Sequence, residues 1–163
     1  MPERPIRLFG DPVLKTVSAP VDEIDDRVRA LVTDLIDSVR VPGRAGVAAP
    51  QIGVNLRVFS YNVDGTVGYV INPEIVELGG EPEKIDEGCL SVPENWHKTP
   101  RHPFARVRGI DLDGTPIEVS GTGLMAQALQ HEVDHLDGLL YLDRLEKDER
   151  RVAMRQIRES DWF

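Results

Sequence analysis

The chain has 163 residues, of which 40% are hydrophobic and 29% are charged, and its formal net charge at pH 7 is −9. These values exclude intrinsic disorder, a collagen-like repeat and a coiled coil as descriptions of the whole chain. A surface that binds nucleic acid over the whole domain would be basic, so direct nucleic-acid recognition is excluded as well. No apolar run approaches the roughly 18 residues of a membrane span, and the first residues contain no apolar stretch of the secretory type. We therefore expect a single cytoplasmic domain over residues 1–163, with no membrane contact.

Residues 1–20 are rich in proline and predict an irregular arm. Over residues 24–39 the apolar side chains recur with helical spacing, which predicts a helix capped by Asp22 and ended by Pro42 and Gly43. Short β-rich runs follow at residues 56–61, 67–71 and 74–78, with a hairpin turn at Asp64 and Gly65.

Two more strands are expected over residues 105–112 and 115–119, joined by a turn at residues 113–114. Residues 124–136 predict a helix that ends at Asp137 and Gly138, and residues 146 to about 160 predict a charged C-terminal helix. Helices and strands in blocks indicate an α+β fold. We expect mostly antiparallel strands packed around a central helix, with an N-terminal and a C-terminal helix beside them.

The strongest chemical signal is the run His131-Glu132-Val133-Asp134-His135 on the expected central helix. Residues i and i+4 share one helix face, so the two imidazoles can bind one metal ion. The carboxylate of Glu132 projects beside that ion, where it can move a proton during amide hydrolysis. An exposed charged helix would match this pattern only by chance, so we interpret the run as a metal site.

Two histidines leave a catalytic metal site short of its third protein ligand. Acidic residues after His135, such as Asp137, Asp143 and Glu146, are possible ligands. The upstream run Glu87-Gly88-Cys89-Leu90-Ser91 offers the only cysteine of the chain, which excludes an internal disulfide. A glycine before the cysteine allows a positive φ or the close approach of a ligand. On this segment alone, however, a buried cysteine without a chemical role is the simpler interpretation.

A third segment, residues 46–53, is a loop of small residues with one amide side chain, Gln51. Such a loop admits a substrate backbone, and a glutamine can donate to a developing oxyanion. Taken by itself, the segment is more simply a tight connection between a helix and a strand.

The three segments together, in this order and at these separations, closely resemble the peptide deformylases, and the resemblance covers nearly the whole chain. It implies that Cys89, His131 and His135 bind the metal and that Glu132 is the general acid and base. It also implies an oxyanion hole formed by the Gln51 side chain and the Leu90 N–H. The remaining implied residues are a supporting pair and a substrate-binding set: Glu87 with Arg101, and Ala45, Gly46, Gly88, Leu124 and Ala128.

The implied reaction is removal of the N-formyl group from the N-terminal methionine of new polypeptides, with release of formate. The resemblance implies one divalent metal ion, Fe²⁺ in the first place, for which Zn²⁺, Ni²⁺ or Co²⁺ can substitute. The implied partners are formylmethionyl nascent chains, with a weak ribosome contact through the C-terminal helix as a further possibility.

The chain departs from the family pattern at three places near the expected substrate cleft. Arg44 and Ala45 precede Gly46 where the family usually has a glycine and an aliphatic residue, and Gln127 introduces a polar group into the methionine pocket. Trp96 stands where an arginine is often found. We also expect His97 and His102 to lie exposed in a proline-rich loop.

Two other functions remain open on the sequence alone. A zinc metallopeptidase of the same helical motif would take its third ligand after His135 and tolerate loss of Cys89. A non-catalytic module that binds ribosomes would not need Glu132, Gln51 and three ligands to be intact.

Overall fold

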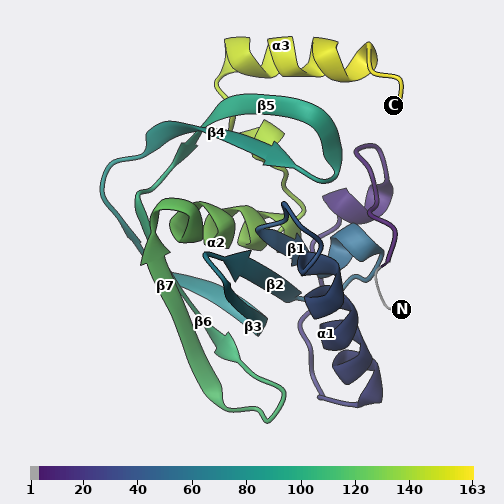
Figure 1. Ribbon diagram of the computed structural model, residues 1–163, viewed down its shortest axis with the longest axis vertical. Helices are drawn as coiled ribbons and strands as arrows, with labels where there is room; N and C mark the ends of the chain where they lie inside the picture. Colours follow the sequence, from purple (N-terminus) through teal and green to yellow (C-terminus); the bar gives the residue numbers. More distant parts are fainter. Residues whose placement is uncertain (1–3) are drawn as a thin grey trace.

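The computed structural model describes residues 4–163, within which two β-sheets and three α-helices form layers (Figure 1). The larger sheet has the strand order β1-β2-β3-β6-β7, and the smaller sheet is the hairpin β4-β5. All paired strands are antiparallel, apart from an isolated parallel bridge between Ala19 and Leu56. The strands are β1 (Gly46–Ala48), β2 (Val58–Val63), β3 (Thr66–Gly79), β4 (Glu83–Cys89), β5 (Val92–Arg101), β6 (Phe104–Ile110) and β7 (Pro116–Thr122).

The helices are α1 (Asp26–Val39), α2 (Gly123–Leu136) and α3 (Lys147–Arg158), with short 3-10 turns at Pro12–Lys15, Ala49–Ile52 and Tyr141–Arg144. Helix α2 lies between the larger sheet and the β4-β5 hairpin, and α3 lies beside β5 (Figure 1). The predicted α+β fold with a central helix is therefore confirmed. Of the predicted N-terminal arm, residues 1–3 lie outside the described residues. Within the described chain, no helix is long and apolar enough to cross a bilayer.

Helix α1 begins later than the sequence predicts. The side chain of Asp25, and not that of Asp22, caps it by accepting a hydrogen bond from the Val28 N–H at 3.1 Å. The predicted cap is wrong because the helix starts only at Asp26. The apolar stripe of α1 packs on β1 and β2 in a core whose buried members include Leu35, Val58 and Ile71.

A second core lies between α2 and the other side of the larger sheet. Leu129 and Leu136 of α2 are fully buried there against Phe59, Val70 and Val107 of three strands. Apolar burial of this kind is the main source of folding free energy. It fixes one face of α2 and leaves the opposite face to the hairpin.

The two predicted strands over residues 67–71 and 74–78 are one long strand, β3, with an irregular register between Ile71 and Glu74. Asn72 at this irregularity has a φ of 52°, and its side chain bonds to both the N–H and the C=O of Val21. The interruption in the sequence pattern therefore marks a bulge and not a loop. The Asp64-Gly65 turn is present, with both residues at positive φ.

Candidate metal centre

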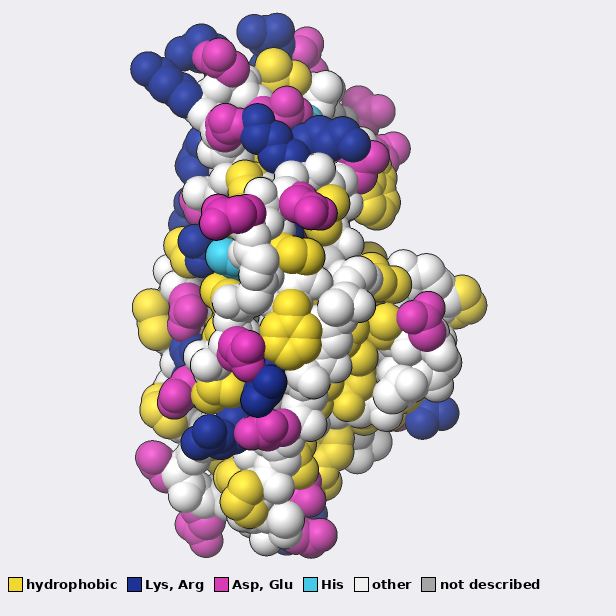
Figure 2. Space-filling view, turned by 90° about the vertical axis from the view of Figure 1, so that its left-hand side faces the viewer, with side chains coloured by type: hydrophobic (Ala, Val, Ile, Leu, Met, Phe, Trp, Pro, Cys, Tyr) yellow, Lys and Arg dark blue, Asp and Glu magenta, His cyan; other side chains and the backbone are white. Residues whose placement is uncertain are grey.

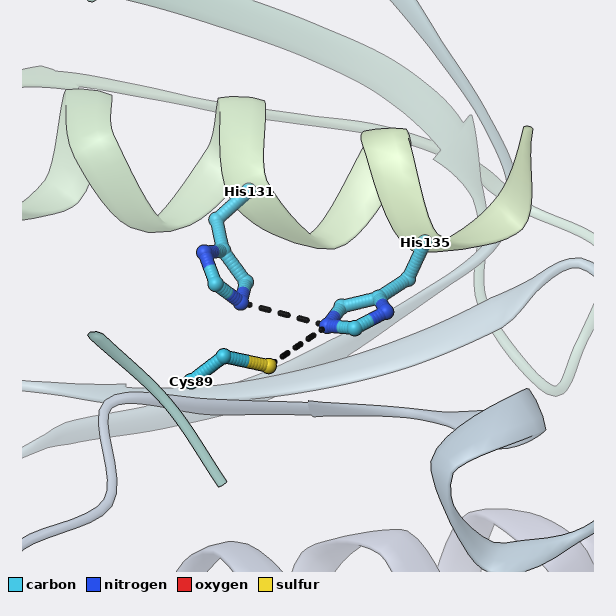
Figure 3. A group of neighbouring side chains, drawn as sticks. All are labelled: Cys89, His131 and His135. Atoms are coloured by element: carbon cyan, nitrogen blue, oxygen red, sulfur yellow. Dashed lines mark hydrogen bonds between the residues drawn. The ribbon is translucent and has the colours of Figure 1, made fainter. Parts of the chain in front are cut away.

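Three side chains that can bind a metal meet between α2 and the hairpin (Figure 3). His131 and His135 stand one turn apart on α2, and Cys89 ends β4. The two Nε2 atoms are 3.1 Å apart, and Cys89 Sγ is 3.4 Å from His135 Nε2. All three ligand atoms lie within 4.8 Å of one another. Three lone-pair donors repel one another unless a proton or cation lies among them, and a His₂Cys set suits Fe²⁺, Zn²⁺, Co²⁺ or Ni²⁺. The residues therefore fit a divalent metal ion.

The acidic residues after His135 are engaged elsewhere. Asp137 pairs with Arg57 at 2.8 Å, Asp143 pairs with Arg150 at 3.1 Å, and Glu146 pairs with Lys84. Among the described residues, Cys89 is thus the side chain that completes the cluster with the two histidines. The structure therefore favours Cys89 over the acidic residues after His135 as the third ligand.

The imidazole of His131 is oriented by the predicted supporting pair. His131 Nδ1 lies 2.6 Å from Glu87 Oε2, and Arg101 holds the same carboxylate through two bonds of 2.8 and 2.6 Å. Burial by itself raises the pKa of Glu87, but the bonds from Arg101 and His131 outweigh it and lower that pKa to about 2. The carboxylate is therefore charged and keeps the His131 Nε2 lone pair turned toward Cys89 and His135.

Asp134 extends this network, although no role was predicted for it from the sequence. Its carboxylate, 4% exposed, binds Arg101 Nη1 at 2.8 Å and Arg144 Nη2 at 2.8 Å. The charges thus alternate from Glu87 through Arg101 and Asp134 to Arg144. A carboxylate on a helix that is buried on two sides needs such partners. An acidic residue within the predicted central helix was therefore the signal in the sequence that could have identified Asp134.

Glu132 lies 3% exposed beside the cluster, and its Oε1 has no hydrogen-bond partner among residues 4–163. Burial raises its pKa to about 7, although the nearby His131 opposes that rise. Gly46 makes room for this side chain, because a Cβ at Gly46 would lie only 2.5 Å from Glu132 Oε2. A buried carboxyl group with a free oxygen can accept and return a proton near neutral pH.

Gln51 is held in one orientation at the side of the cluster. Its Oε1 accepts the Ala48 N–H at 2.9 Å, so its Nε2 points to Ser91 Oγ at 3.2 Å and to Cys89 Sγ at 3.7 Å. Leu90 follows Cys89 in the turn between β4 and β5. The two groups predicted as oxyanion donors thus both belong to residues next to the cysteine.

A cleft of about 440 Å³ opens onto these groups. On the face shown in Figure 2, hydrophobic side chains run along a hollow of the surface. The residues that line the cleft include the proposed ligands Cys89 and His131, with Glu132 beside them, and all predicted oxyanion and substrate-binding positions: Gln51, Leu90, Ala45, Gly46, Gly88, Leu124 and Ala128. His135 lies behind this lining, buried at 1% exposure.

Two expectations about the cleft change with the structure. Gly88 does not adopt a positive φ. Its missing side chain instead leaves space for the indole of Trp96, which a Cβ would meet at 2.8 Å. Gln127 lines the cleft, but its Nε2 is engaged by the hairpin, because it donates to the Asp86 carbonyl at 2.9 Å and to Glu87 Oε1 at 3.4 Å.

The prediction that His97 is exposed is wrong. His97 is 4% exposed on the inner face of β5, while His102 remains partly exposed. The reason is that β5 buries alternate residues that are all polar, namely Asn95, His97, Thr99 and Arg101. Because hydrophobic and polar residues do not alternate along this strand, its sequence does not predict a strand.

Two histidines one helical turn apart, a cysteine beside them and a buried glutamate at the floor of a cleft define a metal-dependent hydrolase of the His-Glu-x-x-His class. The model of the family described as "Polypeptide deformylase" matches residues 3–151. This chain therefore belongs to the polypeptide deformylase family, whose members depend on a metal ion.

Individual relatives agree with this assignment. A peptide deformylase from Acidothermus cellulolyticus is 48% identical over 162 residues, which cover 99% of this chain and 89% of the relative. Peptide deformylase 1 from Corynebacterium glutamicum is 42% identical and covers 100% and 99% of the two chains. The crystal structure of a peptide deformylase from Legionella pneumophila matches with a TM-score of 0.89 at 36% identity, over 96% of this chain and 94% of that one. The predicted family and deformylase activity are confirmed, and the peptidase and the non-catalytic module are not favoured.

Proposed function

We propose that the cleft removes the N-formyl group from the N-terminal methionine of nascent polypeptides and that Cys89, His131 and His135 hold its single divalent metal. The observation that carries this proposal is the convergence of the three ligand atoms beside Glu132 at the floor of the cleft. We propose Fe²⁺ as the native ion, with Zn²⁺, Ni²⁺ and Co²⁺ as substitutes. A bound ion supplies Lewis acidity, which polarises a carbonyl and acidifies water.

Glu132 moves the proton in this proposal. It takes a proton from the attacking water and returns it to the departing amine, so that a poor leaving group departs as a neutral amine. Gly46 leaves the space that this carboxyl group occupies, and in the metal-free protein burial raises the pKa of Glu132 to about 7, near the pH at which both steps take place.

Gln51 and Leu90 stabilise the negative charge that develops on the formyl oxygen. The Ala48 N–H fixes the Gln51 amide, so its Nε2 donor needs no reorganisation during the reaction. One such preorganised donor contributes about 3 kcal/mol to the stability of a transition state.

The substrate backbone adds to the open edge of β1, the first strand in the order of the larger sheet. The Ala45 carbonyl already accepts the Asn62 N–H at 2.8 Å, so Ala45 faces β2 and its neighbour Gly46 faces the open edge. Gly88 flanks the peptide from the hairpin side. The methionine side chain packs against the apolar wall of α2 at Leu124 and Ala128.

Formate release from N-formyl-Met-Ala-Ser tests the proposal, under anaerobic conditions with protein loaded with Fe²⁺ or Ni²⁺. Glu132→Ala should retain the metal and lose activity by a factor on the order of 10²–10⁴. Glu23→Ala, an exposed glutamate before α1, is the matched control and should release formate at the wild-type rate. Metal-loaded protein that releases no formate would overturn the proposed reaction.

Because formylated nascent chains arise in the cytoplasm, we place the activity there. A second candidate role is a weak ribosome contact through α3, whose Arg151, Arg155 and Arg158 are exposed. These side chains can contact phosphates of ribosomal RNA without base recognition. Reversing the charges of Arg151 and Arg155 should reduce co-sedimentation with ribosomes, and unchanged co-sedimentation would exclude this role.

A further inference from the structure

His97 is a buried histidine that the proposed chemistry does not use. It is 4% exposed on β5, and its Nδ1 lies 2.8 Å from Glu149 Oε2 on α3. A carboxylate can only accept a hydrogen bond, so His97 donates its Nδ1–H. The other ring nitrogen, Nε2, is buried and has no partner in the described chain. Burying a ring nitrogen without a hydrogen-bond partner costs free energy, so the position of His97 calls for an explanation.

The ring of His97 leads to a metal ligand through one aromatic side chain. Tyr141, 1% exposed, lies nearly parallel to His97, with ring centroids 6.2 Å apart and planes inclined by 24°. The same tyrosine lies nearly parallel to His131, at 6.5 Å and 20°. Tyr141 is therefore an aromatic neighbour of both imidazoles, in a position from which it can limit the tilt of the His131 ring.

The backbone provides a second connection between His97 and the metal centre. His97 pairs with Glu87 in the register of the β4-β5 hairpin. Side chains at directly paired positions project from the same face of a sheet. His97 thus stands beside the carboxylate that binds His131 Nδ1.

Helix α3 holds this arrangement from outside. Glu149 binds His97, Glu146 pairs with Lys84 of β4, and the buried Ala153 and Ile157 pack in one core with Val92 of β5. Cys89 lies at the edge of that same core. Helix α3 and the residue that precedes it are therefore joined to the hairpin that carries the proposed cysteine ligand.

We propose that His97, held by Glu149, is a positioning residue that keeps the ring of His131 in the plane required for metal binding. Glu87 fixes the direction of the imidazole, and Tyr141 fixes its tilt because His97 supports the tyrosine ring. The inference rests on the proposed metal site. Residues that orient a metal ligand from outside commonly change metal affinity by roughly 10- to 100-fold when they are replaced.

Two substitutions separate the ring of His97 from its hydrogen bond. His97→Asn retains a donor near the position of Nδ1 but removes the ring that contacts Tyr141. His97→Phe retains a ring but removes the bond to Glu149. We expect Co²⁺ release to a chelator to be about tenfold faster in His97→Asn, with shifted visible absorption bands of the bound Co²⁺. In His97→Phe we expect release only a few-fold faster, with bands close to those of the wild type.

Asp148→Asn is the matched control. Asp148 precedes Glu149 on α3, and its side chain is 95% exposed. This variant should release Co²⁺ at the wild-type rate. If His97→Asn does not fold, Glu149→Gln provides the milder test, and it should shift the Co²⁺ bands in the same direction by a smaller amount.

Thermal unfolding of the metal-free proteins measures the contribution of His97 to stability alone. If His97→Asn or Glu149→Gln lowers the melting temperature but leaves both the Co²⁺ bands and the release rate unchanged, His97 only packs and the inference is overturned. Failure of the wild-type protein to bind Co²⁺ would instead overturn the proposed metal site, so the two failures are distinguishable.

Discussion

The two sheets of this molecule bury different kinds of side chain on their inner faces. The larger sheet buries apolar residues such as Phe59, Val70 and Val107, each fully excluded from solvent. The hairpin buries Glu87 on β4 and a polar row on β5 that includes His97 and Arg101. Apolar burial stabilises a fold strongly, whereas a buried ion pair adds little net stability. The larger sheet therefore maintains the fold, and the hairpin fixes the geometry of the site.

Helix α2 joins the two regions because one of its faces is apolar and packs on the larger sheet, whereas the opposite face is polar and faces the hairpin. Leu129 and Leu136 pack on the larger sheet, while His131 and Asp134 engage the charged residues of the hairpin. The apolar face anchors the helix, so the polar face can present its imidazoles in a fixed position. Substitutions on the two sides should consequently have separable effects on stability and on metal binding.

The largest expected effect is the loss of the metal in Cys89→Ala. Removing one of the three proposed ligands should lower Co²⁺ affinity by more than about 100-fold, since even residues that only orient a ligand contribute roughly 10- to 100-fold. The larger sheet should remain folded, with cooperative thermal unfolding and an unchanged far-ultraviolet circular dichroism spectrum. Equilibrium titration with Co²⁺ measures the first effect. Wild-type affinity in this variant would show that another side chain supplies the third ligand.

Leu35→Ala should have the opposite effect: it should lower the stability of the fold and leave metal binding unchanged. Leu35 is fully buried between α1 and the larger sheet, and truncation of such a residue costs about 2–5 kcal/mol of unfolding free energy. Urea denaturation measures this loss. At temperatures where the variant is folded, its Co²⁺ absorption bands and kcat should equal those of the wild type. A parallel fall in kcat would contradict the separation of the two regions.

The elements that the sequence predicted are those with local signals. The helical stripe of α1 and the pair His131 and His135 depend on residues three or four positions apart, and both are present as expected. The β4-β5 hairpin was not predicted, because β5 alternates buried and exposed residues without alternating in hydrophobicity. Its inner polar residues are buried only because partners exist elsewhere in the chain.

The role of Cys89 shows the same limit in the site. Its segment alone favoured a buried cysteine without a chemical role, and only the resemblance to a family indicated a ligand. The distance in sequence between Cys89 and His135 is 46 residues, so no local pattern relates them. The bonds of Asp134 to Arg101 and Arg144 were likewise missed, since they form only in the folded chain.

Glu87→Gln should lower the stability of the metal-free protein by about 3 kcal/mol at pH 7, because Arg101 then keeps only one of its two buried countercharges, Asp134. The pKa of Glu87 falls from 4.5 to about 2 on folding, so its contribution is fully present above pH 4.5 and is lost as the pH falls toward 2. Urea denaturation from neutral pH down to about pH 2 should therefore show the variant and the wild type converging in acid.

Glu77→Gln is the matched control for this comparison. Glu77 pairs with Arg106 at 2.6 Å, but its side chain is 50% exposed. An exposed pair contributes about 0–1 kcal/mol, so this substitution should change stability little at any pH. An effect of Glu87→Gln that is equal at neutral and acidic pH would contradict the assignment of the stability to its charge.

Trp96→Ala should have the smallest effect on the protein, because Trp96 lies on the outer face of the hairpin and not among the buried polar residues of its inner face. Trp96 is 70% exposed at the rim of the cleft and rests on Gly88. Partial burial of the indole by substrate residues after the methionine contributes roughly 1 kcal/mol. We therefore expect KM to rise about fivefold for formylated tetrapeptides with apolar side chains, with kcat and the Co²⁺ bands unchanged.

Two measurements distinguish this effect from general damage. Formyl-Met-Ala, which lacks the further side chains, should keep its KM in Trp96→Ala. In Trp162→Phe, whose fluorescence comes from Trp96 alone, addition of the product tetrapeptide should change the emission. An equal rise in KM for both substrates would contradict a role in binding the later residues. With the expected result, the inner face of the hairpin orients the proposed metal ligands and its outer face contacts the substrate chain, so the same hairpin contributes to metal binding and to substrate binding.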